Sequence, residues 1–276
     1  MEDSVYSALF GALSQEHRLN LIANNLANVN TTGYKKDQVA FMDTFVPMAH
    51  DRITDSKPYL RADPLWPDAD LISRVRLSEQ KTDFSQGGLA LTGNPLDVAI
   101  QGEGFFKVQR PGSGEVFYTR NGSFLLDADG YVKDGGGNYV LAGGGPLQVP
   151  QGAKTLTIDG AGQVRADGAE LGTLDVVSVA DPGGLMKIGN NLFSAAQGAA
   201  AQETPLTPGL PEAVEGQATD TVRATLYQGY LESANVEVVS EMVRMIEVNR
   251  TFEAYQKVMT GSQQLDQKLT SIAQRA

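Results

Sequence analysis

The clearest pattern in the chain is a stripe of apolar residues near its C-terminal end, between residues 235 and 272. Apolar positions there are separated mostly by three or four residues, or by sums of these, which is the spacing of one face of an α-helix. They are Val238, Met242, Met245, Phe252, Tyr255, Met259, Leu265, Leu269 and Ile272. Asn235 is placed to cap this helix, with Glu237 in the first turn. Such a helix spans roughly 55 Å, so much of its stripe needs another long helix, in this chain or in a neighbouring one.

A second apolar stripe occupies the first thirty residues and has the heptad spacing of a coiled-coil helix. Its positions are Val5, Ala8, Ala12, Leu19, Ile22, Leu26 and Val29, with Gln15 as the polar exception. The small side chains around Gly11 would allow another helix to approach closely. Packing on its own domain is the simplest explanation of such a stripe. Because a stripe lies at each terminus, we favour an arrangement in which the two ends pair with each other and then with further copies.

The N-terminal helix is predicted to finish in an asparagine-rich segment, residues 23–35. Four asparagines in seven residues, among them Asn24, Asn25 and Asn28, are unfavourable inside a helix but suit caps and turns. Gly33 provides the positive φ that a chain reversal needs. A structural cap is the simplest interpretation. Asn24 and Asn28 are four residues apart and share a helix face, so they could also bond across to a neighbouring helix.

The middle of the chain carries shorter signals. Residues 38–81 hold four prolines and the only tryptophan, Trp66, and predict an extended, loop-rich segment beside the helices. From residue 84 to 194 the apolar period is two, with turns that contain glycine, which predicts a compact all-β domain of sandwich or irregular-barrel type. The expected strands cover residues 97–101, 105–110, 116–120, 131–133, 139–142, 155–158 and 174–179. Residues 195–220, rich in Ala, Gln, Pro and Gly, predict a linker before a last extended piece at 222–228.

These patterns predict an α+β fold in which long N- and C-terminal helices form a coiled-coil stem and an all-β central domain is inserted between them. The expected divisions are residues 1–46 for the N-terminal helix and turn, 47–82 for the proline-rich extended segment, 83–194 for the β-rich domain, 195–220 for the linker, and 221–276 for the final strand and C-terminal helix.

The amino-acid composition argues against several classes of function. The net charge of −11 in 276 residues argues against nucleic acid, which requires clustered Lys and Arg. Cysteine is absent, which excludes disulfides, thiolate catalysis and cysteine zinc sites, and only two histidines are present. No apolar run is long enough to predict a transmembrane helix. The acidic start Met1-Glu2-Asp3 is unlike the basic region of a secretory signal, so no cleaved signal peptide is expected.

Few residues in the sequence suggest metal binding or catalysis. The segment Asp127–Gly130 begins like a calcium loop but lacks the later oxygen ligands, so a hairpin turn is the better interpretation. Glu79, Asp83 and Asp97 could form a pair of hydrolase carboxylates, yet their spacing cannot show that they converge. No nucleophile with a nearby base is evident. We therefore expect no catalytic residue, cofactor or metal.

Three motifs carry a family resemblance. Ala23–Asn28 followed by Thr32–Lys35 closely resembles the N-terminal signature of the bacterial flagellar axial proteins, the rod and hook family. Gly229–Val236, together with residues 241–253, is similar to that family's C-terminal end. Residues 93–106, continued by 118–124, resemble its central strand motif. The motifs cover both termini and much of the middle, in the family's order.

The resemblance implies a structural, non-enzymatic subunit of the basal-body rod, whose terminal helices polymerise into the drive shaft that carries torque across the periplasm. It implies export by the flagellar type III apparatus without signal cleavage, and it implies copies of itself and other rod proteins as partners. The interface and stem residues would be those of the two stripes with Asn24, Asn25, Asn28 and Gly33. The segment Gly144–Leu147 and the length favour the proximal rod type, with the distal rod type next and hook protein less favoured.

Two other classes remain open. A periplasmic enzyme, such as a peptidoglycan-cleaving rod accessory, would explain the β domain and its acids but not the two terminal stripes. An adhesin or binding module would be a folded monomer with protected termini.

Overall fold

The computed structural model describes residues 2–47, 71–179, 181–195, 203–206 and 224–273. The chain divides into two compact units. We call residues 1–26, 37–81 and 238–276 the helical unit, and residues 27–36 and 82–237 the β-rich unit. The α+β class is therefore confirmed. Neither long helix has the length and apolarity required to cross a bilayer, as far as the described residues extend.

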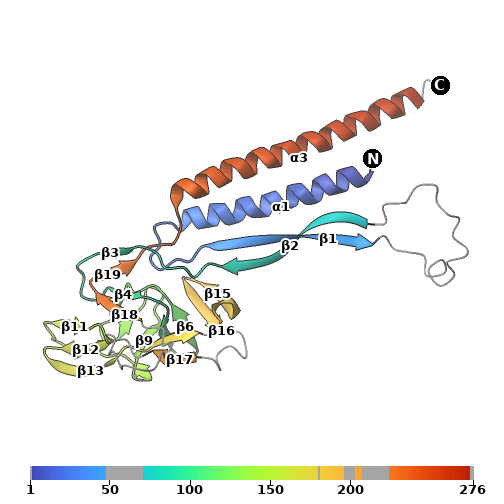
Figure 1. The fold of residues 1–276 in the computed structure, drawn as a ribbon. Helices are drawn as coiled ribbons and strands as arrows, with labels where there is room; N and C mark the ends of the chain where they lie inside the picture. Colours follow the sequence, from blue (N-terminus) through green and yellow to red (C-terminus); the bar gives the residue numbers. More distant parts are fainter. Residues whose placement is uncertain (1, 48–70, 180, 196–202, 207–223, 274–276) are drawn as a thin grey trace, which may run out of the picture. The chain divides into compact units, whose positions relative to one another are not determined.

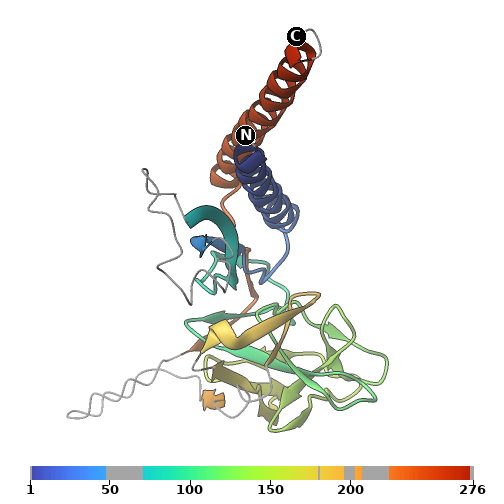
Figure 2. The same ribbon diagram turned by 90° about the vertical axis from the view of Figure 1, so that its right-hand side faces the viewer.

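The helical unit contains two long helices that lie side by side, as Figures 1 and 2 both show. They are α1, Glu2–Ala27, and α3, Val238–Ala273. The helices are close at Gly11, where an added Cβ would lie only 2.5 Å from the ring of Tyr255. The small residue therefore allows the close approach that the sequence predicted.

The same unit contains a two-stranded sheet of β1, Asp37–Pro47, and β2, Leu71–Thr82. In Figure 1 this strand pair runs along α1. The expectation of a loop-rich segment is wrong for these residues, because the prolines beyond Pro47 lie between the two strands and leave both strands uninterrupted. Trp66 lies outside the described residues.

The β-rich unit is built around a ten-stranded sheet whose described pairings are antiparallel. Its strand order is β15 (Leu185–Gly189), β16 (Leu192–Ala195), β6 (Val116–Thr119), β5 (Phe105–Gln109), β9 (Tyr139–Ala142), β8 (Val132–Lys133) and β7 (Leu125–Leu126). Off this path, β10 (Gly145–Pro146) pairs with β9, and β14 (Val176–Val179) pairs with β5 and with β17 (Glu203–Leu206). A short 3-10 helix, Pro182–Gly184, precedes β15.

Three smaller sheets complete the unit. One consists of β11 (Leu156–Ile158), β12 (Gln163–Ala166) and β13 (Ala169–Thr173). In the other two, β4 (Val98–Gln101) pairs with β18 (Thr225–Gln228), and β3 (Leu89–Leu91) pairs with β19 (Tyr230–Glu232). The last strands before α3 thus pair with the first strands of the unit, so the β-rich unit is closed by its own two ends.

The core is formed by alternating apolar side chains of these strands. The fully buried members include Val98, Phe106, Val108, Val140 and Val164. All seven expected strands overlap observed ones, because the period of two marks residues that must alternate between core and solvent. The expected linker at 195–220 is wrong in one part, since residues 203–206 form β17 and pair with β14; most of its other residues lie outside the described ranges.

One glycine of the central motif is required by packing. An added Cβ at Gly122 would lie 1.6 Å from the backbone oxygen of Val98, whose amide donates to the Gly122 carbonyl. We expect Gly122→Ala to destabilise the β-rich unit by about 2 kcal/mol or more, because the clash is with backbone. Gly135→Ala is the matched control, since nothing lies within 4 Å of its added Cβ. Denaturant unfolding checks this, and equal stability of the two variants would contradict it.

Candidate assembly surfaces and a buried polar anchor

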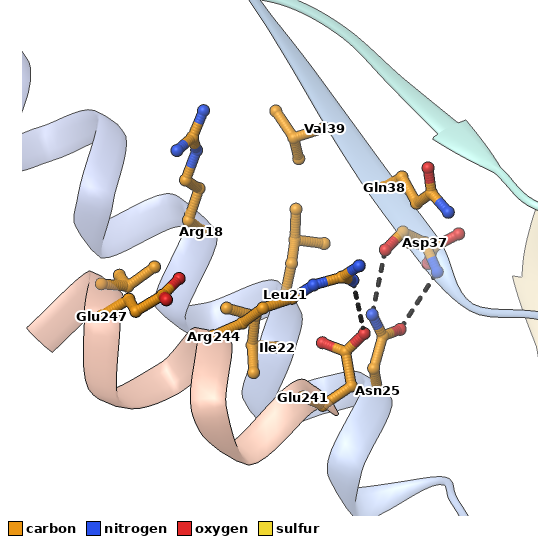
Figure 3. Close-up of a pocket in the computed structure, with 11 residues that line it drawn as sticks. Arg18, Leu21, Ile22, Asn25, Asp37, Gln38, Val39, Glu241, Arg244 and Glu247 are labelled. Atoms are coloured by element: carbon orange, nitrogen blue, oxygen red, sulfur yellow. Dashed lines mark hydrogen bonds and ion pairs between the residues drawn. The ribbon is translucent and has the colours of Figure 1, made fainter. Parts of the chain in front are cut away.

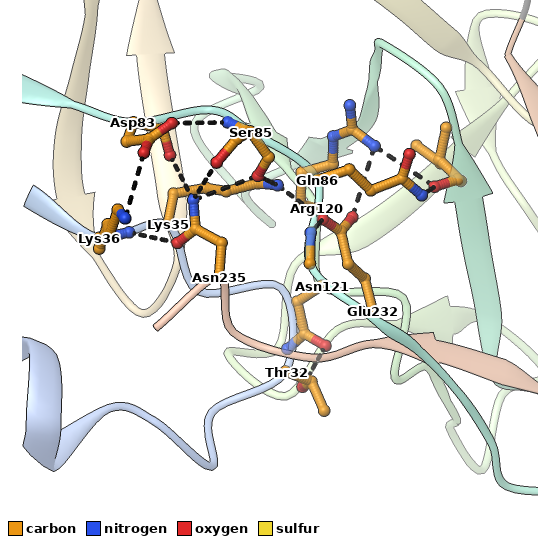
Figure 4. A network of polar contacts seen from close by, with 12 residues as sticks. Thr32, Lys35, Lys36, Asp83, Ser85, Gln86, Arg120, Asn121, Glu232 and Asn235 are labelled. Atoms are coloured by element: carbon orange, nitrogen blue, oxygen red, sulfur yellow. Dashed lines mark hydrogen bonds and ion pairs between the residues drawn. The ribbon is translucent and has the colours of Figure 1, made fainter. Parts of the chain in front are cut away.

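Three charged side chains meet inside the β-rich unit (Figure 4). The Nζ of Lys35 lies 2.6 Å from Oε1 of Glu232, and Nη1 of Arg120 lies 3.4 Å from Oε2 of the same carboxylate. The side chains of all three are at most 4% exposed. Ionised groups this deeply buried are tolerated only when they are paired and hydrogen-bonded. We call this cluster the buried anchor.

Further hydrogen bonds support the anchor, although the Nε of Arg120 is buried without a hydrogen-bond partner. Lys35 Nζ also donates to the Ser85 carbonyl at 2.8 Å, and Arg120 Nη2 donates to the Gly102 carbonyl at 2.7 Å. The amide of Gly87 donates to Oε1 of Glu232 at 2.9 Å. Burial lowers the pKa of Lys35, and Glu232 opposes that shift by attraction and a hydrogen bond. Burial likewise lowers the pKa of Arg120. The carboxylate of Glu232 is therefore the counter-charge on which both cations depend.

A second polar cluster, formed by Lys36, Asp83 and Asn235, lies next to the buried anchor, and we call it the hub. It shows that the expected start of the C-terminal helix is wrong. Asn235 does not cap α3, which begins at Val238. Its Oδ1 accepts the Lys36 amide at 2.7 Å, and its Nδ2 donates to the Asp83 carbonyl at 2.8 Å. Lys36 and Asp83 also form an ion pair at 3.5 Å. The carboxamide is engaged on both its oxygen and its nitrogen, so it joins chain segments instead of ending a helix.

The turn after α1 is fixed to the central motif. Gly33 has φ +67°, as its role in a chain reversal predicted, and its amide donates to the Glu232 carbonyl at 2.7 Å. An added Cβ on Gly33 would lie 2.5 Å from the Asn121 amide nitrogen. The Thr32 hydroxyl is hydrogen-bonded to the Asn121 side chain at 2.8 Å. Glycine is thus needed here for close approach as well as for its dihedral angle.

The anchor therefore brings together all three motifs of the family resemblance. Residues 32–35 come from the N-terminal motif, 120–122 from the central one and 232–235 from the C-terminal one. Sequence reasoning did not find this site. The available signal was that Lys35, Arg120 and Glu232 are charged residues inside the three motifs.

The helical unit contains a pocket of about 370 Å³ lined by α1, β1 and the first turns of α3 (Figure 3). Asn25, which is buried, lies at its edge and holds the two ends of the turn segment together. Its Nδ2 donates to the Asp37 carbonyl at 2.9 Å, and its Oδ1 accepts the Asp37 amide at 3.0 Å. Asn25 therefore acts within its own chain, by closing the loop between α1 and β1.

The pocket wall has apolar and charged parts. Ile22 and Val248 supply apolar surface, while Glu241 is 3% exposed and accepts a hydrogen bond from Nη1 of Arg244 at 2.9 Å. No group of three or more side chains that could hold a metal ion occurs among the described residues.

The predicted stem residues fall into two sets. Most are buried or half-buried, namely Ala8, Ala12, Leu19, Ile22 and Leu26 on α1, and Met245, Phe252, Tyr255 and Met259 on α3. Val238, Met242 and Leu265 are instead 36%, 50% and 56% exposed. The side chains of Val5 and Leu269 lie outside the described ones. The predicted C-terminal stripe therefore includes residues of two faces of α3, an inner face that is buried or half-buried and an outer face that is exposed in the isolated chain.

Sequence reasoning missed members of both faces. Val248 and the buried Glu241 complete the inner face, which then alternates between four- and three-residue steps from Glu241 to Met259. Val239, Val243, Ile246 and Val258 are between 50% and 69% exposed and belong to an outer apolar surface. We call Val239, Met242, Val243 and Ile246 the outer patch.

The asparagines Asn24 and Asn28 do not share a helix face, because α1 ends at Ala27. Asn24 is an exposed residue of the last turn of α1, and the Oδ1 of Asn28 accepts a bond from the Thr31 hydroxyl at 3.3 Å. The side chain of Asn28 is thus bonded within the turn that follows α1.

The candidate acids Asp83 and Asp97 have separate structural roles. Asp97 accepts bonds from Thr92 and Asn94, 2.6 and 3.0 Å away. Asp83 belongs to the hub at Asn235, and the side chain of Glu79 lies outside the described ones. Residues 127–130 form the β7–β8 hairpin turn, with a bond from the Gly130 amide to the Asp127 carbonyl at 2.9 Å. The hairpin interpretation is confirmed.

Comparison with known proteins assigns the family. Residues 7–35 match the family model described as "Flagella basal body rod protein", residues 99–166 match "Flagellar hook protein FlgE/F/G D1 domain", and residues 227–272 match "Flagellar basal body rod FlgEFG protein C-terminal". The chain is 33% identical over 278 residues to flagellar basal-body rod protein FlgG of Buchnera aphidicola subsp. Schizaphis graminum, covering 99% of this chain and 100% of the relative.

Two further relatives are similar over nearly their whole length. FlgG of Agrobacterium fabrum is 32% identical over 265 residues, or 94% of each chain, and FlgF of Caulobacter vibrioides is 29% identical over 266 residues, or 96% of this chain and 95% of the relative. Two terminal helices and a β-rich middle that all match these families define an axial protein of the bacterial flagellum. The chain belongs to the flagellar basal-body rod protein family and is a structural subunit of that rod.

Removing the counter-charge tests the anchor. Glu232→Leu leaves Lys35 and Arg120 as buried, uncompensated cations, and we expect it to lower the free energy of unfolding by about 3–5 kcal/mol. Glu115→Ala is the control, because it breaks an exposed ion pair with Arg110, worth about 1 kcal/mol or less. Denaturant unfolding at neutral pH measures the free energy of unfolding of both variants. If Glu232→Leu lost less stability than Glu115→Ala, the anchor would not be stabilising.

The hub at Asp83 predicts a dependence of stability on pH. Burial acts to raise the pKa of Asp83, but hydrogen bonds from Ser85 and the charge of Lys36 outweigh it, so the pKa lies below its ordinary value. The stabilisation is therefore present above about pH 4, the unfolded-state value, and is lost as the pH falls through the lower folded-state pKa. We expect Asp83→Asn to reduce the loss of stability between pH 5 and pH 2, measured by urea unfolding. If Asp83→Asn lost as much stability between pH 5 and pH 2 as the unmodified chain, this role of Asp83 would be contradicted.

Proposed function

We propose that α1 and α3 form a coiled-coil stem and that this stem polymerises with the stems of neighbouring rod subunits. The observation that carries the proposal is the separation of two apolar faces on α3. The inner face alternates in steps of four and three residues, the spacing of a coiled-coil seam. The outer patch is at least half exposed over four large side chains. Contiguous exposed apolar surface of this kind marks interaction sites.

Polymerisation gives the outer patch its partner. Each added subunit buries apolar surface of the stem before it and presents its own, so growth is driven by removal of apolar surface from water. The difference in helix length supports the same arrangement, since α3 has 36 residues and α1 has 26. At 1.5 Å per residue the excess corresponds to about 15 Å of helix, which α1 cannot match and which a neighbouring stem can cover.

The resulting tube would be a drive shaft that transmits torque through the periplasm, with the chain delivered by the flagellar type III export apparatus without signal cleavage. These expectations follow from the family resemblance. The net charge of −11 supports a chain without a nucleic-acid partner. We also propose a purely structural role without catalysis, because the buried ionised groups pair with one another and Asp83 and Asp97 are engaged in the hub and in a turn.

The position within the rod is proposed from the relatives. FlgG is the more frequent name among them, which favours the distal type that the sequence placed second. The segment Gly144–Leu147, which favoured the proximal type, is a local feature of the structure. It spans β10, and the Gly144 amide donates to the Asp175 carboxylate at 2.9 Å. A turn of this kind carries little information on assembly, so the distal type is the better-supported proposal.

A charged residue introduced into the outer patch tests whether this patch is buried when stems assemble. We expect Ile246→Asp, at a side chain 52% exposed, to leave the stability of the isolated subunit within about 1 kcal/mol. It should nevertheless lower incorporation into purified basal bodies at least tenfold, because assembly would bury the new charge. Thr251→Asp is the matched control: it places the same charge at an exposed polar position about 140° around the helix.

Immunoblotting of basal bodies and swimming assays give the readouts. Normal incorporation of Ile246→Asp would overturn the proposed stem contact. A third variant, Val248→Asp at a side chain 8% exposed, should unfold the helix pair and so separate loss of folding from loss of assembly.

A further inference from the structure

The sequence contains one Asn-Gly pair, Asn121–Gly122, and the structure places it where the central motif meets the turn after α1. Asparagine is a chemically labile residue. It is most labile before glycine, because a residue without a Cβ leaves its backbone nitrogen unhindered and free to rotate. That nitrogen can then reach the side-chain carbonyl carbon of the asparagine before it. The pair is therefore a candidate site of covalent modification that needs no enzyme.

The chemistry of such a pair is a ring closure followed by hydrolysis. The backbone nitrogen of Gly122 bonds to Cγ of Asn121 and loses its proton, and the side-chain nitrogen leaves as ammonia, which gives a succinimide. Water then opens the ring at either of its carbonyls. One product is aspartate with an unchanged main chain. The other is isoaspartate, in which the main chain runs through the former side chain and is longer by one carbon.

In the folded protein both reacting groups are held by contacts. Oδ1 of Asn121 accepts a bond from the Thr32 hydroxyl at 2.8 Å (Figure 4) and another from the Ser123 amide at 3.1 Å. The Gly122 carbonyl accepts the Val98 amide at 3.0 Å, and an added Cβ on Gly122 would lie 1.6 Å from the Val98 oxygen. Ring closure must bring Cγ to bonding distance of the Gly122 nitrogen, so these contacts have to open first.

The aspartyl product fits the folded structure. Both bonds to the Asn121 side chain end on Oδ1, and its Nδ2 makes no hydrogen bond within the part of the chain that the structure describes. A carboxylate accepts the same two bonds, so exchange of the nitrogen for oxygen removes no contact. The side chain is half-buried, so the new charge keeps contact with water.

The isoaspartyl product does not fit, because the main chain around Asn121 has no room for another carbon. On one side Gly33 approaches so closely that its added Cβ would lie 2.5 Å from the Asn121 nitrogen. On the other side Gly122 lies against the Val98 carbonyl, where even a methyl group would clash. A packed interior does not yield such space without cost. The isomer also moves the side-chain carbonyl into the main chain, so the Thr32 hydroxyl loses its acceptor.

We propose that Asn121 is a site of spontaneous deamidation that is open in the unfolded chain and closed in the folded one, and that its isoaspartyl product cannot complete the β-rich unit. A chain that stays unfolded therefore loses the ability to fold as it ages, whereas a chain that has folded keeps its Asn121 amide. The inference concerns the folding of a single subunit and does not rest on the proposed polymerisation.

Ageing of the full purified chain tests the site. Matched samples are kept at the same mildly alkaline pH in native buffer and in guanidinium chloride, and peptide maps by mass spectrometry follow the loss of the Asn121 amide. We expect this loss to be at least about tenfold faster in denaturant, because the native contacts must open before the ring can close. Asn138, which precedes the bulky Tyr139, is the internal control and should stay intact for longer in denaturant. Equal rates at Asn121 in the two samples would overturn the proposal, as would an intact Asn121 in denaturant.

Refolding then separates the two products. The aged, denatured chain is diluted into native buffer, and gel filtration separates folded from misfolded chain. We expect the aspartyl product to enter the folded fraction in the proportion present before refolding. The isoaspartyl product, identified by labelling with an isoaspartyl methyltransferase, should be depleted there at least about fivefold, because the packing around Gly122 excludes it. Its recovery in undiminished proportion would overturn the proposal.

A variant that cannot form the ring assigns the effect to this residue. Asn121→Ser should keep its refolding yield during ageing in denaturant, relative to its own fresh sample, while the unmodified chain loses yield over the same time. A loss in Asn121→Ser as large as that of the unmodified chain would place the damage at another residue and overturn the role of Asn121. If Asn121→Ser does not fold, the distribution of products in the unmodified chain decides the question.

Discussion

The constraint on which this structure depends is the cost of burying charge. Glu232 lies 197 residues from Lys35 and 112 from Arg120 along the chain, yet its carboxylate is the counter-charge of both. None of the three can be desolvated alone, so the β-rich unit closes only when the segment after α1, the central strands and the segment before α3 arrive together. The buried charges therefore require the first and last segments of the β-rich unit to lie next to each other.

The division of α3 into an inner and an outer face explains how one helix can serve two partners. The inner face contacts α1 at Tyr255 and Gly11, while the outer patch remains available for another molecule. The surfaces differ in composition as well as direction, since the inner face includes the buried Glu241 with its Arg244 partner. Association through the outer patch would leave the helix pair of each subunit intact.

Helices and strands could be predicted from the sequence because they repeat at a regular spacing. Sites formed by residues that are distant in the sequence could not. Both helices and every expected strand followed from apolar spacing, because that spacing records which side of an element must leave water. The role of Asn235 could not be deduced, since a carboxamide before a helix looks the same whether it caps the helix or joins distant segments. The outer patch was missed for another reason: apolar residues on two adjacent faces of one helix overlap in a linear pattern. The anchor was missed because spacing says nothing about which charges meet in space, even though its members lay within recognised motifs.

The division of the chain into units has a mechanical consequence. The chain crosses from one unit to the other four times, at residues 26/27, 36/37, 81/82 and 237/238. One connecting segment would leave the two units free to rotate about it, whereas four connections restrict such rotation. Lys36, Asp83 and Asn235 lie next to three of these crossings and are bonded to one another within the β-rich unit. A load applied to one unit would therefore be shared among four connections instead of being carried by one.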